Sequence, residues 1–288
     1  MSIEVRNLTY TYSKGLPDEH TALSNVNFSV YDDEIAAIIG HTGSGKSTLV
    51  QQLNGLLKPD EGNIFVGGQD ITQPGVVMRD IRKKVGLVFQ YPEYQLFEET
   101  VRLDVAFGPK NLGLEQEEIE RRVDEALRLV GLDPEEIGER SPFDLSGGQR
   151  RRVAIAGVIA MKPEVLILDE PTAGLDPGAH RDIIQMIREI HENEHNIIIF
   201  VSHNMGDVAE LADKVMVIER GKVIAMGSPR EIFLQPARLS AIGLNVPPAT
   251  ELVRKIRERG VEIDTNVLNV DEAEEALYRV LMEKQSRK

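Results

Sequence analysis

The chain has 288 residues, of which 41% are hydrophobic, and it is predicted to be a soluble globular protein with one large domain and a small one, or two modest lobes. Its formal net charge of −14 works against sequence-independent nucleic-acid binding, which needs a basic face, so we expect no nucleic-acid partner. The absence of cysteine excludes disulfides, a thiolate nucleophile and a thiolate metal site.

Short apolar runs alternate with helical stretches along the chain, and this order predicts a largely parallel sheet with helices on its faces. None of the runs approaches the roughly 20 residues of a membrane helix, so another chain would have to supply any channel. The alternation at 26–30 and the run at 64–66 before two glycines predict antiparallel strands beside that sheet. Buried strands are expected at Ile35–Ile39, 85–89, 165–168 and 197–201.

Helical periodicity at 115–130 and 147–160 predicts a helical subdomain of about residues 92–160, inserted into a domain of residues 1–228. A glycine-serine-proline break then separates a small, mostly helical region of residues 229–288. Apolar residues in this region recur at the spacings of a packing face, which either covers its own domain or holds two subunits together. They are Leu252, Val253, Ile256, Val261, Ile263, Leu277, Val280 and Leu281.

A glycine-rich segment follows the strand expected at Ile35–Ile39 and leads into an apolar helix start. In such a loop, successive backbone N–H groups converge on a β-phosphate at a helix N-terminus. Lys46 would reach the β and γ oxygens, and the Ser47 hydroxyl would bind magnesium. A turn with a surface lysine is the plain alternative, but the flanking strand and helix favour a nucleotide site. The predicted binding residues are Gly40, His41, Thr42, Gly43, Ser44, Gly45, Lys46, Ser47 and Thr48.

Two carboxylates, Asp169 and Glu170, follow the strand expected at 165–168. Strands often finish in acidic turns, so this pair becomes informative only because a phosphate loop needs an acidic partner. We expect Asp169 to lie in the magnesium shell together with Ser47. Glu170 would orient and polarise the attacking water as catalytic base.

Polar residues also follow two other buried strands: Gln90 comes after 85–89, and His203 comes just after 197–201. Ligand chemistry in open parallel sheets gathers at the carboxyl ends of strands, so both residues can face the same γ-phosphate and water. We therefore assign both of them to the catalytic site, and Gln90 also to the magnesium. A histidine after a strand is more often an ordinary loop residue. Of the six histidines in the chain, however, His203 is the one whose position suits the catalytic site.

Residues 145–149 read Leu-Ser-Gly-Gly-Gln, a rare pentapeptide that suits neither the phosphate loop nor the strand ends. Ser146 is a natural N-cap for the helix at 147–160, whose first N–H groups and dipole would form an anion site. One fold cannot readily bring two such helix N-termini onto opposite sides of one nucleotide. We therefore predict a dimer in which Leu145, Ser146, Gly147, Gly148 and Gln149 complete the partner's site.

With these motifs, residues 3 to about 227 resemble the ATP-binding cassette (ABC) ATPases. The resemblance implies an α/β P-loop NTPase fold of the ABC ATPase type, with an antiparallel β subdomain and an inserted α-helical subdomain. It implies ATP and Mg²⁺ as cofactors. In it Gln90 matches the Q-loop, Leu145–Gln149 the signature and His203 the switch histidine.

Two further positions are taken from this resemblance. The segment Ala173-Gly174-Leu175-Asp176 looks like the D-loop, which implies that Asp176 also contacts ATP in the partner's site. Many relatives carry serine where this chain has Ala173, which puts any contact through that hydroxyl in doubt. Tyr12 matches the aromatic residue that stacks on adenine, and Tyr10 is the rival for that place.

A closer resemblance is to the ATPases of energy-coupling factor (ECF) transporters, the EcfA/CbiO family, and to the second, A-prime type, of its paralogues. It rests on 38–46, 54–59, 90–97, 154–158 and the insertion at 16–20. It implies a peripheral protein at the cytoplasmic face of the cell membrane, whose ATP hydrolysis energises uptake of vitamins or transition-metal ions.

The same resemblance implies the partners. They are a sister ATPase in a heterodimer, or a second copy in a homodimer, together with a transmembrane coupling subunit and a substrate-binding membrane subunit. The ATPase of another importer, such as one for amino acids, is an alternative. A soluble cassette protein acting as a mechanical clamp is another, but the chain has neither a long coiled-coil insertion nor a second cassette.

The segment just after Gln90 mixes carboxylates with large apolar side chains, and we interpret it as a groove for a basic helix of the membrane subunit. A solvated helix start, where acidic residues favour the dipole, is the alternative. The residues concerned are Glu93, Tyr94, Leu96, Phe97, Glu98 and Glu99.

Overall fold

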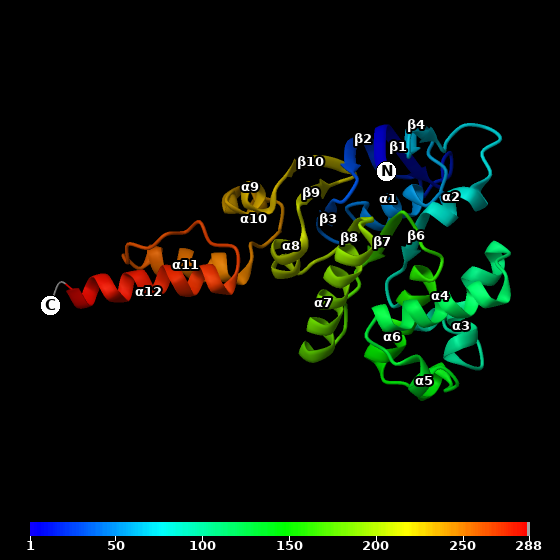
Figure 1. The fold of residues 1–288 in the computed structure, drawn as a ribbon. Coiled ribbons are helices and arrows are strands. Elements are labelled where there is room, and N and C mark those ends of the chain that lie inside the picture. Colours follow the sequence, from blue (N-terminus) through cyan, green and yellow to red (C-terminus); the bar gives the residue numbers. More distant parts are fainter. Residues whose placement is uncertain (287–288) are drawn as a thin grey trace.

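The computed structural model describes residues 1–286 and is built around a six-stranded sheet with the order β10-β9-β3-β8-β7-β6 (Figure 1). Strand β3 runs parallel to β8 and β9, β7 runs parallel to β8 and β6, and β10 is antiparallel to β9. The four strands predicted as buried apolar runs are confirmed, and all their residues are buried because both faces of the sheet are covered. The bounds are β3 Ile35–Ile39, β6 Val85–Val88, β7 Val165–Asp169, β8 Ile197–Val201, β9 Lys214–Glu219 and β10 Lys222–Gly227.

A second sheet is antiparallel, as predicted, with the order β2-β1-β4-β5. Its inner face shares one apolar core with the helix α1 (Lys46–Leu53) and with one face of the large sheet. Helix α2 (Met78–Lys84) adds the buried Ile81 to the same core. The strands are β1 Ser2–Tyr12, β2 His20–Tyr31, β4 Glu61–Val66 and β5 Gln69–Asp70.

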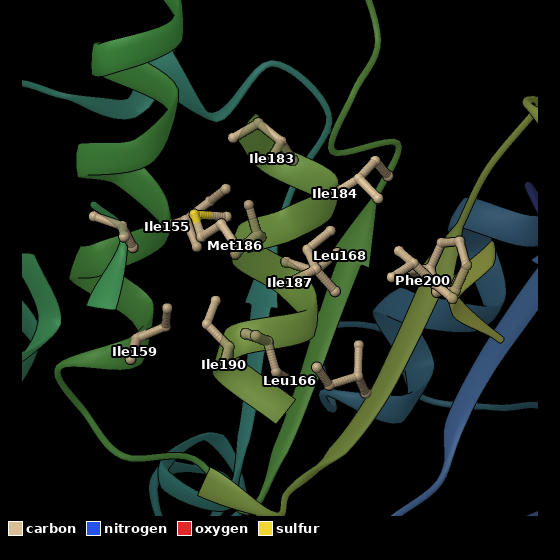
Figure 2. Packing of buried hydrophobic residues seen from close by; sticks show 14 of the residues in the cluster. Ile155, Ile159, Leu166, Leu168, Ile183, Ile184, Met186, Ile187, Ile190 and Phe200 are labelled. Atoms are coloured by element: carbon tan, nitrogen blue, oxygen red, sulfur yellow. The ribbon is translucent and has the colours of Figure 1, made fainter. Parts of the chain in front are cut away.

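Helix α7 (Pro177–Glu194) covers the opposite face of the large sheet and forms the centre of the other core (Figure 2). Its apolar residues recur every three or four positions, so Ile183, Ile187 and Ile190 all lie on the buried side. They pack toward Leu166 of β7 and toward the neighbouring helix α6 (Gly147–Ile159). Helix α8 (Met205–Leu211) completes this layer.

A helical subdomain lies between β6 and β7 in the chain and at one end of the sheet in space (Figure 1). Two of its helices, α4 and α6, are where the periodicity predicted them. Helix α3 was not predicted, because Gly108 and Pro109 in its interior read as breakers although Pro109 is buried. The elements are η1 Pro92–Gln95, α3 Val101–Leu112, α4 Gln116–Leu129, α5 Pro134–Ile137, η2 Pro142–Asp144 and α6 Gly147–Ile159.

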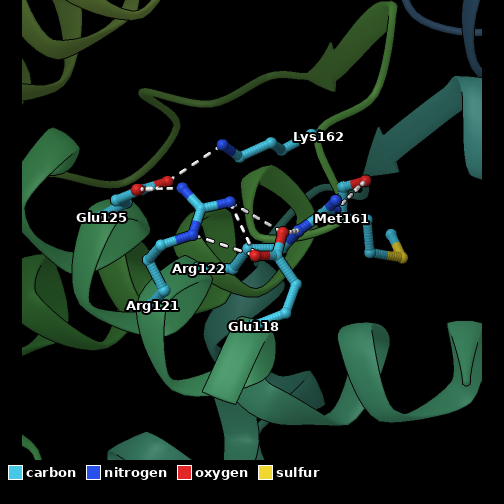
Figure 3. A network of polar contacts seen from close by, with 6 residues as sticks. All are labelled: Glu118, Arg121, Arg122, Glu125, Met161 and Lys162. Atoms are coloured by element: carbon cyan, nitrogen blue, oxygen red, sulfur yellow. Dashed lines mark hydrogen bonds and ion pairs between the residues drawn. The ribbon is translucent and has the colours of Figure 1, made fainter. Parts of the chain in front are cut away.

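A polar network fastens α4 to the turn between α6 and β7 (Figure 3). Arg122 donates to the Met161 carbonyl, and Lys162 pairs with Glu125 at 2.9 Å. Within α4, Glu118 accepts hydrogen bonds from Arg121 and Arg122, which lower the pKa of its carboxyl to about 2. The network joins the helical subdomain to the strand that carries the predicted catalytic carboxylates.

The C-terminal region divides into two parts. Ile232, Phe233 and Leu239, from α9 and α10, join the main core, so these helices cover β9 and β10. Helices α11 and α12 form a hairpin with an apolar cluster of its own, and the hairpin extends away from the sheet on the side opposite the helical subdomain (Figure 1). The bounds are α9 Pro229–Phe233, α10 Pro236–Ala241, α11 Pro248–Glu258 and α12 Val270–Ser286.

Most of the predicted packing face of residues 229–288 serves to hold the hairpin together. Val253 and Ile263 are buried in its cluster, and Ile256, Leu277 and Val280 pack against that cluster. Leu252 and Leu281 remain exposed. No helix within residues 1–286 combines the length and the apolar composition needed to cross a membrane.

Candidate functional site

The predicted phosphate loop leaves the carboxyl end of β3, in the middle of the sheet, and enters α1. Two of its glycines cannot be replaced by a residue with a side chain. A Cβ on Gly40 would lie 2.3 Å from the Ile218 carbonyl oxygen. Gly45 has a φ of +106°, and a Cβ there would lie 2.5 Å from the Ala22 carbonyl oxygen. Neighbouring backbone therefore fixes the path of the loop.

The polar atoms of this loop suit an anion. The Lys46 ammonium donates to the carbonyls of Gly40 at 2.7 Å and His41 at 3.0 Å. Burial lowers the pKa of Lys46, although the charges of Glu170 and Asp169 work in the opposite direction. The Ser44 hydroxyl is fully buried and has no hydrogen-bond partner within the described chain. A phosphate oxygen in the loop would satisfy that donor.

The oxygen ligands of the predicted magnesium site lie side by side. The Ser47 hydroxyl hydrogen-bonds to Asp169, whose pKa is raised by burial in spite of that bond. A hydroxyl next to a carboxylate fits Mg²⁺, which is commonly held by one or two protein oxygens and completed by phosphates and water. Residues 1–286 contain no group of three or more His, Cys, Asp or Glu side chains that could hold a metal without such help.

Gln90, Glu170 and His203 meet at the carboxyl ends of β6, β7 and β8. The Gln90 amide donates to one oxygen of the Glu170 carboxylate at 3.0 Å. The other oxygen lies 2.8 Å from Nε2 of His203. Glu170 adopts a left-handed backbone conformation with φ +52°, which is uncommon for a non-glycine residue and frequent at functional sites. Glu170 and His203 line a pocket of about 490 Å³.

Tyr12, the residue predicted to stack on adenine, is half-exposed at the end of β1. Its hydroxyl lies 3.2 Å from that of Thr48, in the helix that follows the phosphate loop. Tyr10 packs edge-on against Tyr12, with 4.8 Å between ring centroids, and lies against the core. Tyr12 is therefore the more accessible of the two, and its role stays a prediction.

The signature residues begin α6 as predicted from the serine cap. The Ser146 side chain accepts from the Gln149 N–H, and the Gln149 side chain accepts from the Ser146 N–H. Residues 146–149 line a pocket of about 430 Å³ together with Asp176, and the side chains of Glu170 and His203 line a different one. Asp176 caps α7 by accepting from Gly178 and Ala179. Five of the six predicted trans contacts thus lie together, apart from Glu170 of their own chain, whereas Leu145 is buried in the core.

The interpretation of the segment after Gln90 as a docking groove is wrong for Glu93, although Leu96 and Phe97 of the same segment do line a groove. Glu93 does not face a docking groove: its side chain is 13% exposed, and both its oxygens are bound by Arg151. Arg151 was missed because it stands in a run of three arginines. The signal that could have found it is its spacing, since it lies four and eight residues before the buried Ile155 and Ile159.

The sequence reasoning also missed a polar cluster that includes Thr172, in the loop that follows Glu170. Asp207, which is buried in α8, lies 3.0 Å from Nε2 of His180 and accepts from the Thr172 hydroxyl at 3.2 Å. The three residues join α8, α7 and the loop after β7. Burial raises the pKa of Asp207, although His180 and Thr172 act to lower it.

The chain is similar to known proteins over nearly its whole length. Residues 23–173 match the family described as ABC transporter. The energy-coupling factor transporter ATP-binding protein EcfA2 of Caldanaerobacter subterraneus is 57% identical, with 98% of each chain covered. The structure of cbiO1 from Clostridium perfringens, part of the ABC transporter complex cbiONQ, is 39% identical with a TM-score of 0.74, covering 88% of this chain and 98% of that one.

A more distant solved structure is the dimeric ATP-binding cassette MJ0796 in a post-hydrolysis state bound to ADP and Pi. It is 28% identical with a TM-score of 0.69, covering 79% of this chain and 98% of that chain.

The buried Asp207 gives a testable pH dependence. The pKa of Asp207 is raised in the folded protein, so the unfolded chain releases this proton at a lower pH than the folded protein does. The free energy of unfolding therefore falls as pH rises from the unfolded-state pKa to the folded-state pKa of Asp207. Asp207→Asn removes that loss. We expect the urea midpoint of the variant to rise relative to that of the wild type as pH increases through this window.

The control is Asp182→Asn, a change at an exposed carboxylate of α7. Its midpoint should follow that of the wild type at every pH. Parallel profiles for the wild type and Asp207→Asn would contradict the prediction.

Proposed function

Because the chain belongs to the ABC transporter family, and within it to the ATP-binding proteins of energy-coupling factor transporters, we propose that it is the ATP-hydrolysing subunit of an importer. The observation that carries the assignment is the contact of Gln90 and His203 with the two oxygens of Glu170. The substrates named by the resemblance are vitamins or transition-metal ions. Identity of 57% over 98% of the chain favours this importer over a cassette of another transporter or a mechanical clamp.

The division of labour at the ATP site follows from the chemistry of each group. Lys46, the Ser44 hydroxyl and the loop amides bind the phosphates, and Tyr12 stacks on the adenine. Ser47 and Asp169, with Gln90, would hold Mg²⁺, and the bound ion would neutralise the developing charge on the phosphate oxygens. Glu170 accepts the proton of the attacking water.

Glu170 is held in place for this step by its two neighbours. The Gln90 amide fixes one oxygen of the carboxylate, and His203 fixes the other. The carboxylate therefore has a set orientation before ATP binds, and hydrolysis needs little rearrangement of this group. Since Gln90 and His203 follow the carboxyl ends of neighbouring strands, both also face the place proposed for the γ-phosphate.

The signature acts in a second subunit. Its helix N-terminus lies in a separate pocket from Glu170 and His203, so one chain has half of each composite site. We propose that Ser146–Gln149 and Asp176 contact ATP bound to the partner. That partner is a sister ATPase in a heterodimer or a second copy of this chain.

The C-terminal hairpin is proposed to hold the two ATPases together. Its own cluster leaves an apolar stripe exposed: Tyr278 is 62% exposed and Leu281 60%, three positions apart on α12, and Leu252 of α11 is also exposed. Residues spaced by three lie on one face of a helix. The apolar cluster inside the hairpin forms without these side chains, so they are free to contact a second subunit.

The membrane partner is proposed to bind a groove between α2, α3 and α6. This groove of about 710 Å³ has an apolar wall in which Phe97 and Phe107 pack edge to face, with 5.0 Å between ring centroids, and both are exposed. We propose this groove as the docking site in place of the surface around Glu93. We infer that the transmembrane coupling subunit inserts a helix here, which places the chain at the cytoplasmic face of the membrane and links it to the substrate-binding subunit.

Changing Glu170→Gln tests the catalytic assignment. The amide keeps the hydrogen-bonding shape but cannot accept a proton, so turnover should fall at least about 100-fold while ATP affinity is retained. Lys46→Ala should instead weaken ATP binding itself. Nucleotide titration and phosphate release, measured on the dimer, separate the two effects. Hydrolysis at the wild-type rate by Glu170→Gln would overturn the assignment.

The double change Tyr278→Ser and Leu281→Ser tests the hairpin. If these side chains are buried between subunits, the dissociation constant of the nucleotide-free dimer should rise about tenfold or more. Light scattering at several concentrations measures it. Arg279→Ser, at an exposed site on a different face of the same helix, is the control and should leave the dimer unchanged. A dimer equally stable in both variants would show that the interface lies elsewhere.

The double change Phe97→Ser and Phe107→Ser tests the groove. Removing the two rings should abolish copurification with the membrane subunit and solute uptake, and leave ATP hydrolysis by the isolated dimer unchanged. Phe143→Ser, which removes another exposed ring of the helical subdomain, is the matched control. An intact, fully coupled complex of the double variant would exclude the groove as the docking site.

A further inference from the structure

Arg151 is the most deeply buried charged side chain of the helical subdomain, with 1% of its surface exposed. It lies in the second turn of α6, the helix that begins with the signature. Its guanidinium binds both oxygens of Glu93, at 2.7 and 3.0 Å. It also donates to the carbonyls of Pro171, at 3.0 Å, and Ala173, at 2.7 Å.

These partners belong to segments with different tasks. Glu93 lies in η1, three residues after Gln90 and four before Phe97 of the proposed docking groove. Pro171 and Ala173 lie in the loop that follows the catalytic Glu170 and leads to Asp176. The guanidinium also lies over the ring of Tyr91, 5.8 Å from its centroid. One side chain therefore bridges the docking segment, the signature helix and the loop after the catalytic carboxylate.

The chemistry of this bridge requires arginine. A planar guanidinium can satisfy a carboxylate with two parallel bonds and still donate to carbonyls on its other edge, whereas a lysine ammonium is a point charge. Burial alone would raise the pKa of the Glu93 carboxyl, but the hydrogen bonds and charge of Arg151 outweigh it and hold the pKa below its ordinary value. The buried pair is thus ionised, and the loss of either partner leaves an uncompensated charge.

A pair that only stabilised the helical subdomain would have its partners within that subdomain, as Glu118 does with Arg121 of the same helix (Figure 3). Arg151 instead reaches out of the subdomain to two carbonyls of the loop after β7. A displacement of η1 moves Glu93, and through Arg151 it moves both the signature helix and that loop. The contact leaves the phosphate loop untouched.

We propose that Arg151 is a positioning residue that transmits the position of η1, beside the docking groove, to the loop 171–176 and thereby sets the rate of ATP turnover without contributing to ATP affinity. The proposal rests on the proposed ATPase function. Arg151 acts through Glu93 on one side and through the carbonyls of Pro171 and Ala173 on the other.

The first test uses Glu93→Gln and Arg151→Lys in the full-length dimer. Amide hydrogen exchange of a peptide covering 171–176 should rise in both variants, although Glu93 does not contact that loop. Turnover should fall about tenfold, the size of effect expected for losing a hydrogen bond to a charged group, and ATP affinity from nucleotide titration should stay unchanged. Glu118→Gln removes a carboxylate from another arginine pair of the same subdomain and should change none of the three readouts.

The second test is a double-mutant cycle on turnover between Glu93→Gln and Leu175→Ala in the loop 171–176. If the effect is transmitted through Arg151, the effects of the two changes on turnover should be non-additive in a chain that keeps Arg151. They should be additive in a chain that also carries Arg151→Lys. Unchanged exchange at 171–176 in Glu93→Gln, or additive effects in the Arg151 background, would overturn the proposal. A wild-type chain without ATPase activity would contradict the proposed function. Hydrogen exchange at 171–176 does not depend on hydrolysis, so it would still test the role of Arg151 in that case.

Discussion

The contacts of Gln90 and His203 with Glu170 require three strands to end at the same level. Strands β6, β7 and β8 run parallel in matched register, with Val88 beside Leu168 and Asp169 beside Val201. That register brings residues far apart in the chain onto one carboxylate, and β3 delivers the phosphate loop to the same edge. A slip of one residue in any of these pairings would turn the side chains to opposite faces and remove the site.

The signature helix and the catalytic residues proposed for this chain lie on two separate surfaces. The signature helix begins in a pocket of its own, apart from the one that Glu170 and His203 line, so under the proposed function a second subunit supplies the other half of each ATP site. Arg151 reaches out of the helical subdomain, and its contacts with Glu93 and Ala173 tie η1 to the loop that follows β7.

Local patterns predicted the parts of this molecule whose signals are local. The apolar runs of β3, β7 and β8 are buried on both faces, so their sequence alone marks them, and the Ser146 cap is recognisable from four residues. The pairing of Glu93 with Arg151, and of His180 with Asp207, joins residues 58 and 27 positions apart, and neither has a local signature. Glu93 consequently read as a surface carboxylate. Helix α3 was missed because a proline in a helix interior is tolerated here by its tertiary setting.

The α11–α12 hairpin has a cluster separate from both main cores, and its ties to α9 run through Arg230, which donates to Asn266 and pairs with Glu272. A unit with so small a core opens locally at a lower free-energy cost than the sheet domain it is attached to. Subunits joined through such a unit can separate and find new partners while each ATP site stays folded. Under the proposed role of the hairpin, the lifetime of the assembled pair is then set by the opening of these two helices, so warming would speed exchange of subunits well before it inactivates the motor.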